Sequence, residues 1–264
     1  MYKKIDDSHI YYEIINKDKP ETIIFIHGLG SDNSCFRAYL QYFTNYRIIV
    51  FDLPAFGKSN NNKAYNLAEE IRLTTKFIKS FKLTNYHIVA YSLGGIIAMQ
   101  HIAQHQNMVK KLILINTPLS LVRVSYLTRL MLILRYYFSF ILPFKLLAKI
   151  ICNNLFSANE ALAKLFYKQI INSDRKTYKN IVKNLKYYDI ANYQHKLFNT
   201  EFLAQINRKI LYIFGTEDKL IDSQSQLKLS QAKNYKLING NHGLFEEQQV
   251  KEIGQEILKF IAEL

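Results

Sequence analysis

Cysteine is scarce and tryptophan is absent in this chain of 264 residues. Two cysteines, Cys35 and Cys152, are too few for a disulfide scaffold and indicate a reducing compartment, so we expect a cytoplasmic protein. The N-terminal stretch MYKKIDDSHIYYEI has no apolar segment of the kind that a secretory signal requires. From the missing tryptophan we draw no function.

Long uncharged hydrophobic runs are missing as well. The most apolar stretch, RLMLILRYYFSFILPFKLLAKI at 129–150, is interrupted by Arg135 and Lys145. No uncharged run therefore approaches the roughly 20 residues that a membrane-spanning helix needs. We expect no transmembrane segment.

Acidic residues are fewer than basic ones, and the imbalance is local. The net charge is +14, yet residues 117–204 hold 13 Lys or Arg against 4 Asp or Glu, while the rest holds 22 against 17. Such a basic segment favours an anionic partner through long-range attraction. An acidic acyl carrier protein, an anionic lipid surface and an acidic substrate are the candidates, beside a merely soluble basic surface. No zinc-finger spacing, RNP-like pattern or basic heptad array is present, so we expect no nucleic acid.

Short β-like runs alternate with helical patterns along the chain, which predicts an α/β fold around a mainly parallel sheet. We expect strands at 9–15, 21–26, 46–52, 86–91, 111–116, 209–215 and 234–239. Apolar residues at helical spacing predict helices at 66–81, 94–106 and 246–264.

About ninety residues between the strands at 111–116 and 209–215 look helical and contain no strand pattern. We therefore expect a core formed by residues 1–116 and 205–264, with residues 117–204 as a helical cap. Within the cap, Arg123, Arg129 and Arg135 are six residues apart and would point in three directions on an ideal helix. That pattern fits a cap with an apolar underside better than a helix lying on a membrane.

Ser92 lies between a buried strand and a helix in the stretch IVAYSLGGIIAM. It either caps the helix that follows or is a nucleophile on a tight strand-to-helix turn. Such a turn needs small residues two before and two after the serine, and Ala90 and Gly94 meet this need. Gly95 would let the helix approach the sheet.

A serine nucleophile needs a histidine base and a carboxylate that orients the base. Asp218 follows the strand at 209–215 and His242 follows the strand at 234–239, in the chain order expected for this fold class. Both lie past the carboxyl ends of strands, where open parallel sheets place their sites. Glu217 and Asp222 are the nearest rivals for the carboxylate.

An acyl-transfer site also needs two backbone N–H groups to hold the developing oxyanion. We expect one from Leu93, directly after the nucleophile, and one from Leu29 in the loop IHGLG after an early strand. His27 and Gly28 would shape that loop, with a role as base the less favoured alternative for His27.

Together HGLG, DLPAFGKS, AYSLGG, GTED and GNHGLFEE resemble the α/β-hydrolase superfamily over nearly the full length of the chain. The resemblance implies an eight-stranded, mostly parallel sheet with flanking helices and a helical cap after the sixth strand. Carried over residue by residue, it implies Ser92 as nucleophile, Asp218 as acid and His242 as base, with Leu29 and Leu93 at the oxyanion hole. A serine at the turn argues against the haloalkane dehalogenase and epoxide hydrolase branches, which use Asp.

Three further polar residues are interpreted as structural and not as part of a site. His101 and His105 stand four apart on a predicted helix, but no third ligand accompanies them, so we expect a solvated helix end and no metal. For Asp52 we expect hydrogen bonds that brace its own loop.

These residues predict hydrolysis of a carboxylic ester with an acyl chain through an acyl-enzyme on Ser92, with no cofactor. The chain is similar to pimeloyl-acyl-carrier-protein methyl ester esterases in size, order of the three residues and SLGG turn, which makes that substrate the specific hypothesis. A lipid or monoacylglycerol esterase, a thioesterase and a C–C bond hydrolase are alternatives, since one fold hosts all of them. A ligand-binding receptor that retains the pocket and a basic interaction module are the non-enzyme alternatives.

Overall fold

The apolar runs of the sequence form the central strands of one sheet. The computed structural model describes residues 1–61, 64–119, 144–156, 159–185 and 205–263. The strands are β1 (Tyr2–Ile5), β2 (Ser8–Ile15), β3 (Thr22–Ile26), β4 (Arg47–Phe51), β5 (Asn60–Asn61), β6 (Tyr86–Tyr91), β7 (Val109–Ile115), β8 (Ile210–Gly215) and β9 (Asn234–Ile238). Every residue of β3, β6 and β8 is buried, as expected for strands covered on both faces.

Eight strands follow one another across the sheet in the order β1-β2-β4-β3-β6-β7-β8-β9, and the two-residue β5 pairs with β2. From β4 to β9 all neighbours are parallel, whereas β2 pairs antiparallel with both β1 and β4. The predicted α/β-hydrolase architecture, with its mostly parallel eight-stranded sheet, is confirmed.

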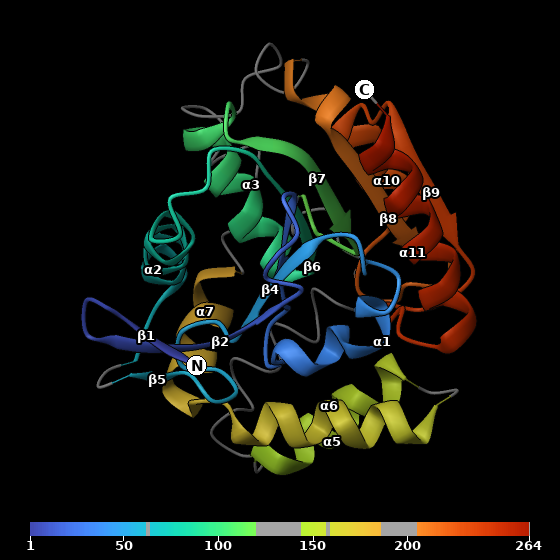
Figure 1. The fold of residues 1–264 in the computed structure, drawn as a ribbon. Helices are drawn as coiled ribbons and strands as arrows, with labels where there is room; N and C mark the ends of the chain where they lie inside the picture. Colours follow the sequence, from blue (N-terminus) through green and yellow to red (C-terminus); the bar gives the residue numbers. More distant parts are fainter. Residues whose placement is uncertain (62–63, 120–143, 157–158, 186–204, 264) are drawn as a thin grey trace.

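Helices cover both faces of this sheet (Figure 1). The helices are α1 (Arg37–Leu40), α2 (Leu67–Lys79), α3 (Leu93–His105), α5 (Phe144–Leu155), α6 (Glu160–Asn172), α7 (Arg175–Leu185), α10 (Ser223–Ser230) and α11 (Glu247–Ala262), with short 3-10 turns η1 (Asn33–Phe36) and η2 (Asn207–Lys209). Helices α2 and α3 pack together on one face, and α1 and α11 on the other.

Local chemistry sets where these helices begin. The Asn66 side chain accepts from the Glu69 amide, and the Glu69 carboxylate accepts from the Asn66 amide, so a capping box starts α2 one residue inside the predicted boundary. Helix α11 starts from a similar pair, Glu246 and Gln249. Strand β1, strand β5 and the short helices α1 and α10 were not predicted, because they are brief or polar and lack a clear period.

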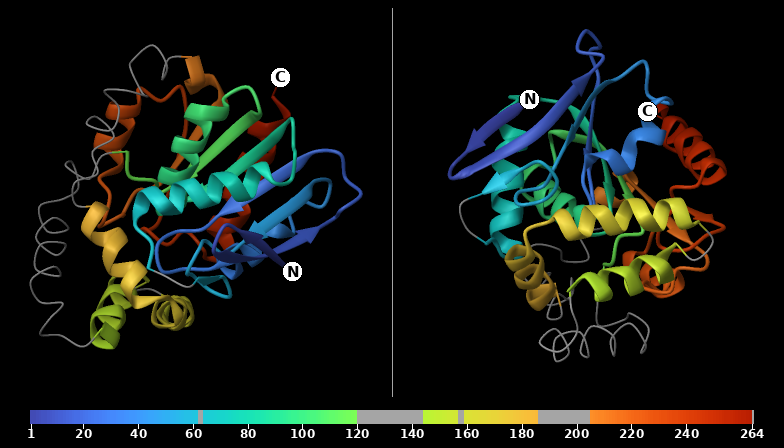
Figure 2. Two further views of the ribbon diagram at one scale, coloured as in Figure 1. Left: turned by 90° about the vertical axis from the view of Figure 1, so that its left-hand side faces the viewer. Right: turned by 90° about the horizontal axis from the view of Figure 1, so that it is seen from below.

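The cap elements α5, α6 and α7 lie between β7 and β8 in the chain, where the insertion was predicted. In two views α5 and α6 run side by side along one edge of the molecule (Figure 2). The domain boundaries at 116/117 and 204/205 stay predictions. Residues 120–143, which hold Arg123, Arg129 and Arg135, lie outside the described residues, so the prediction from their spacing has no structural counterpart here. Within the described residues, no helix is long and apolar enough to cross a membrane.

Candidate active site

Ser92 lies on a strained turn between β6 and α3. Its backbone has φ 51° and ψ −116°, a region that residues other than glycine rarely occupy. The Ser92 side chain makes no capping hydrogen bond to α3, so the reading of Ser92 as a helix cap is wrong. The turn instead leaves the hydroxyl available to a partner from another loop.

That partner is His242, in the loop after β9. Its Nε2 lies 3.0 Å from Ser92 Oγ, and its Nδ1 lies 2.7 Å from Asp218 Oδ2. A carboxylate only accepts hydrogen bonds, so the Nδ1 atom carries the proton and Nε2 is left to accept from the serine hydroxyl. The structure thus brings together Ser92, His242 and Asp218, the three residues that the sequence singled out.

Asp218 is held by its own loop. Its side chain is 1% exposed, and Oδ1 accepts the amides of Leu220 at 2.8 Å and Ile221 at 3.0 Å. The other oxygen, Oδ2, is thereby left for the imidazole of His242. Both predicted rivals lie elsewhere: Glu217 is exposed, and Asp222 caps the start of α10 by accepting from the Gln224 amide.

The loop after β3 approaches the turn so closely that only glycine fits at two positions. A Cβ on Gly28 would stand 2.9 Å from the Tyr91 ring and 3.2 Å from Ser92 Cβ, and a Cβ on Gly94 would stand 2.2 Å from the Ile26 carbonyl oxygen. This contact sets the loop that carries Leu29 against the N-terminus of α3, where the amide of Leu93 has no partner within the helix. The predicted oxyanion donors are therefore on adjoining segments.

The turn at Leu29 has its own structural reason. The Ser31 amide donates to the Gly28 carbonyl at 3.2 Å, and Gly30 has φ 73°, so the chain reverses across Leu29. A Cβ on Gly30 would stand 2.9 Å from both Ile170 and Tyr178 of the cap, so the cap packs directly on this turn.

His27 is a structural residue, as predicted. It is fully buried; its Nε2 accepts the Leu53 amide at 2.8 Å, and its Nδ1 lies 2.8 Å from the Gly28 carbonyl oxygen. Burial lowers the pKa of the imidazole, which keeps it neutral. With both ring nitrogens used, His27 joins the loop after β3 to the loop after β4 and has no capacity left to act as a base.

Asp52 also braces loops, as predicted. Its carboxylate accepts the Lys58 amide at 2.7 Å and the Asn33 amide at 2.8 Å, and it is 1% exposed. Gly57, with φ 53°, passes so close that a Cβ there would stand 2.4 Å from Asp52 Oδ2. The two loops beside the site are thus tied together through one carboxylate.

The prediction of a solvated helix end at His101 and His105 is wrong for His101. That residue is fully buried, with Nε2 2.6 Å from the Tyr86 hydroxyl and Nδ1 3.3 Å from Thr75 Oγ1. Burial lowers the pKa of His101 to about 3. The helix packs this face against α2, which the spacing of two histidines does not reveal. Within the described residues, no cluster of three potential metal ligands occurs.

Two residues that position His242 were missed. The Asn116 amide group donates to the His242 carbonyl at 2.6 Å and its Oδ1 accepts the Gly215 amide at 2.8 Å, while the Tyr91 hydroxyl donates to the same carbonyl at 3.1 Å. Burial raises the pKa of Tyr91 well above its usual value, so the phenol keeps the proton that it donates. Asn116 could have been predicted from the sequence, because it is a polar residue at the carboxyl end of a strand, where parallel sheets place their sites.

Aromatic side chains connect the cap to this site. The ring centroids of Phe156 and Phe166 lie 4.4 Å apart, those of Phe166 and Phe245 5.2 Å, and those of Phe245 and Tyr91 4.9 Å. A Cβ on Gly243, the neighbour of His242, would stand 1.9 Å from Phe156. The underside of the described cap is therefore apolar directly beside the His242 loop.

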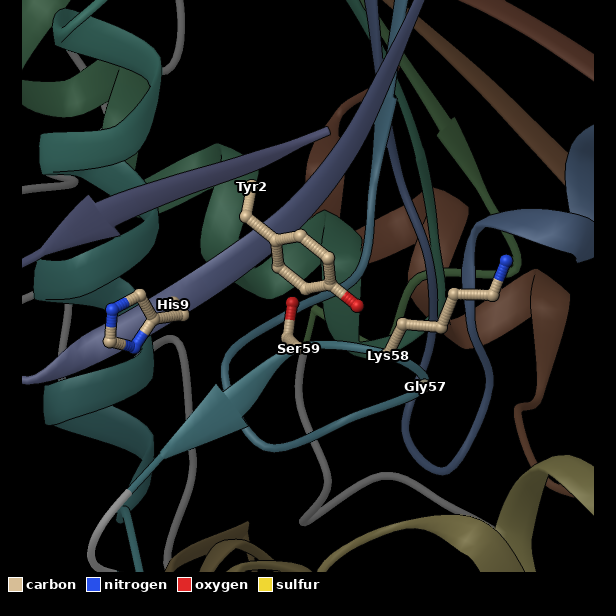
Figure 3. A pocket seen from close by; sticks show the side chains of 5 residues that line it. All are labelled: Tyr2, His9, Gly57, Lys58 and Ser59. Carbon is tan, nitrogen blue, oxygen red and sulfur yellow. The ribbon is translucent and has the colours of Figure 1, made fainter.

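A shallow groove of about 530 Å³ lies elsewhere. Tyr2, His9, Gly57, Lys58 and Ser59 line it, and none of them belongs to the Ser92 site (Figure 3). Lys58 Nζ lies 4.5 Å from the centre of the Tyr11 ring, and the Ser59 hydroxyl donates to the Asp52 carbonyl at 2.7 Å. These contacts show that the Lys58 and Ser59 side chains of this groove stabilise the outer side of the loop after β4.

Comparison with known proteins agrees with this fold. Residues 21–249 match the family model described as the alpha/beta hydrolase fold. The chain belongs to the α/β hydrolase fold family. The enol-lactonase from Burkholderia xenovorans LB400 has the same fold, with a TM-score of 0.82 at 16% identity over 100% of both chains. The bromoperoxidase from Bacillus anthracis reaches 0.81 at 17% identity, covering 100% of this chain and 99% of that one.

Curated relatives within the α/β hydrolase fold family match over shorter stretches. The probable lysophospholipase BODYGUARD 2 of Arabidopsis thaliana is 35% identical over 112 residues, which are 39% of this chain and 24% of that protein. The putative carbamate hydrolase RutD of Serratia proteamaculans is 26% identical over 112 residues, 40% of this chain and 42% of that protein. The chain thus matches less than half the length of either relative.

Proposed function

We propose that this protein is a serine hydrolase that cleaves a carboxylic ester through an acyl-enzyme on Ser92. The observation that carries the proposal is the imidazole of His242, which lies 3.0 Å from the Ser92 hydroxyl and 2.7 Å from the Asp218 carboxylate. A serine on a strained turn with a base so oriented is the arrangement needed for nucleophilic catalysis.

In the first step His242 Nε2 takes the proton from Ser92 while Oγ attacks the ester carbonyl carbon. The amides of Leu29 and Leu93 would stabilise the oxyanion of the tetrahedral intermediate. His242 then gives its proton to the leaving alcohol, and the acyl group stays on Ser92. Water, deprotonated by the same imidazole, attacks this acyl-enzyme and releases the acid, which restores the serine.

The substrate that the site supports best carries an acyl chain. The aromatic side chains of Phe156, Phe166 and Phe245 pack together between the cap and the His242 loop, which makes this region apolar. Five of the curated relatives are named probable lysophospholipases, which favours a lipid ester. The methyl ester of a pimeloyl-acyl-carrier protein is the specific alternative that the sequence suggested, and a thioester would follow the same steps.

Hydrolysis of p-nitrophenyl esters over a series of acyl lengths tests the proposal. We expect turnover that peaks at one chain length and falls by about 10⁴-fold or more in Ser92→Ala, because the nucleophile is lost. Ser225→Ala, at a serine on α10 whose hydroxyl donates to Asp222 and not to any of the three site residues, is the control and should keep full activity.

A wild type as inactive as Ser92→Ala on every chain length, on a lysophospholipid and on an acyl-carrier methyl ester would contradict ester hydrolysis. If, in addition, a ligand bound equally well to both proteins, the receptor reading would replace the enzyme.

A further inference from the structure

The outer faces of α5 and α6 carry an unusual combination of exposed aliphatic and basic side chains. Of the seven large hydrophobic side chains that are exposed within the described residues, three lie here: Leu146 at 44%, Ile150 at 39% and Leu165 at 40%. Leu146 and Ile150 are four residues apart and share one face of α5, and contiguous exposed apolar surface is characteristic of interaction sites.

Lysines alternate with these aliphatic side chains. Lys145 precedes Leu146, Lys149 precedes Ile150, and Lys164 precedes Leu165, with Lys168 one turn further on; all four lysines are exposed. Residues three and four apart share a face of a helix, so each helix presents one mixed stripe. We call these four lysines and three aliphatic residues the α5–α6 face.

The opposite sides of both helices are buried. Ala148 and Cys152 of α5, and Ala163, Phe166 and Ile170 of α6, are 5% exposed or less. The two helices pack against each other and lie side by side on one edge of the molecule (Figures 1 and 2). The exposed stripes are therefore the solvent side of a packed helix pair, with the inner side covered by the protein.

Few acidic side chains offset this charge. Residues 144–156 and 159–185 together hold eight Lys or Arg but only two acids, Glu160 and Asp174. Glu160 pairs with Lys164 at 2.7 Å, yet both side chains are more than 70% exposed, where such a pair contributes little. Asp174 accepts the Thr177 amide at the start of α7. The α5–α6 face stays strongly basic.

We propose that the α5–α6 face docks on an anionic phospholipid surface. Lysine side chains can lay their methylene stems along the apolar region and keep the ammonium groups at the lipid phosphates. Leu146, Ile150 and Leu165 would insert among them, as apolar residues flanked by lysines do on interfacial helices. A bilayer offers both the phosphate groups and the acyl chains that such a mixed face would contact.

Docking would place the candidate site just beneath the lipid surface. Phe156 directly follows α5 and contacts Gly243 beside His242, so the end of α5 adjoins the loop of the candidate site. If the proposed function holds, the substrate is a lipid ester drawn from that surface. The docking itself does not depend on the chemistry.

Sedimentation with vesicles tests the docking on the full chain carrying Ser92→Ala, so that hydrolysis does not alter the lipid. We expect binding to vesicles of phosphatidylcholine mixed with phosphatidylglycerol to be at least about tenfold stronger than to phosphatidylcholine alone, and to weaken as salt is raised. Equal binding to both kinds of vesicle, or no binding to either, would overturn the proposal.

Two pairs of substitutions locate the surface. Lys149→Glu with Lys168→Glu should weaken binding by about tenfold or more, whereas Lys228→Glu with Lys251→Glu, the same charge change on α10 and α11, should change it by about twofold or less. Leu146→Ser with Leu165→Ser should also weaken binding, whereas Tyr235→Ser, at an exposed site on β9, should not. If the double variants on α5 and α6 bound vesicles as well as their controls, the α5–α6 face would not be the docking surface.

Two further readouts separate this inference from its rivals. If the wild type ignores vesicles but a purified acidic acyl carrier protein binds through Lys149 and Lys168, the partner is a protein and lipid docking is refuted. Turnover of a water-soluble p-nitrophenyl ester should be the same in the cap variants and the wild type. Vesicle binding without any esterase activity would refute the proposed function and leave the docking standing.

Discussion

At the scale of single residues, this site depends on close approach. Ser92 has φ 51°, and the facing loop comes so close to it that a Cβ on Gly28 would stand 3.2 Å from Ser92 Cβ. Gly95 has a similar role further along, because a Cβ there would stand 1.9 Å from Thr117 Oγ1. Backbone strain of this kind costs about 1–3 kcal/mol and persists only when the surrounding packing enforces it.

Replacing Asp218 by Asn tests the orientation of the imidazole. Oδ1 is already held by the amides of Leu220 and Ile221, so the new NH₂ group would face His242 Nδ1 and leave Nε2 protonated. Nε2 could then no longer take the serine proton, and we expect kcat for ester hydrolysis to fall by about 10⁴-fold. Asp222→Asn, at the cap of α10, is the control. A loss of less than about tenfold in Asp218→Asn would contradict this role.

At the scale of elements, the cap is tied to the loops that form the site. Gln169 of α6, only 4% exposed, accepts from Ser31 Oγ at 3.0 Å and donates to Asp32 Oδ1 and Ser34 Oγ, both at 2.9 Å. The Asp174 amide donates to Ala55 O at 3.0 Å. These bonds clamp the segment that begins at Leu29 between the cap and the core.

Gln169→Leu should therefore affect catalysis as well as stability. We expect a loss of about 1–3 kcal/mol in the free energy of unfolding and a drop of about tenfold in kcat, since the loop carrying the Leu29 amide loses its anchor. Gln226→Leu is the matched control: Gln226 is fully buried and accepts the Leu119 amide at 2.7 Å, so its loss should lower stability alone. Equal kcat in both variants would reduce Gln169 to a purely structural residue.

Sequence patterns located the three site residues but not the residues that hold them. Ser92, Asp218 and His242 each follow a strand, and the ends of parallel strands meet at one edge of the sheet, so their convergence follows from order alone. Gln169 lies in the cap and contacts Ser31, 138 residues earlier in the chain. No periodicity or local motif encodes a contact over that separation.

At the scale of the whole molecule, the free energy of unfolding depends on pH through buried histidines. His87 of β6 is 2% exposed, and neither ring nitrogen has a hydrogen-bond partner in the structure described. Burial lowers the pKa of His87 to about 4, opposed by Glu21 and reinforced by Lys110 and Lys111. The native state thus keeps this imidazole neutral under conditions in which the unfolded chain would protonate it.

The free energy of unfolding should fall as the pH drops from 6.5 toward 4. In that range the unfolded chain binds a proton at His87 that the native state does not, so acid favours unfolding, by up to about 3 kcal/mol from this residue. His87→Leu should lessen this dependence, and the buried His27 and His101, whose pKa values burial also lowers, should retain part of it. Denaturant titrations at a series of pH values measure the dependence, and parallel curves for wild type and His87→Leu would contradict the prediction.

From the sequence alone we predicted most strands in their order along the chain, a helical insertion between the strands at 111–116 and 209–215, and Ser92, Asp218 and His242 as site candidates, because these follow from apolar periodicity and from position relative to the strands. The folded structure was needed to show that His101 is buried, that His27 joins two loops, and that Asn116 and Tyr91 hold the His242 backbone. Those outcomes depend on which surfaces meet across the sheet. Packing brings distant segments into hydrogen-bond range, and local sequence does not record that distance.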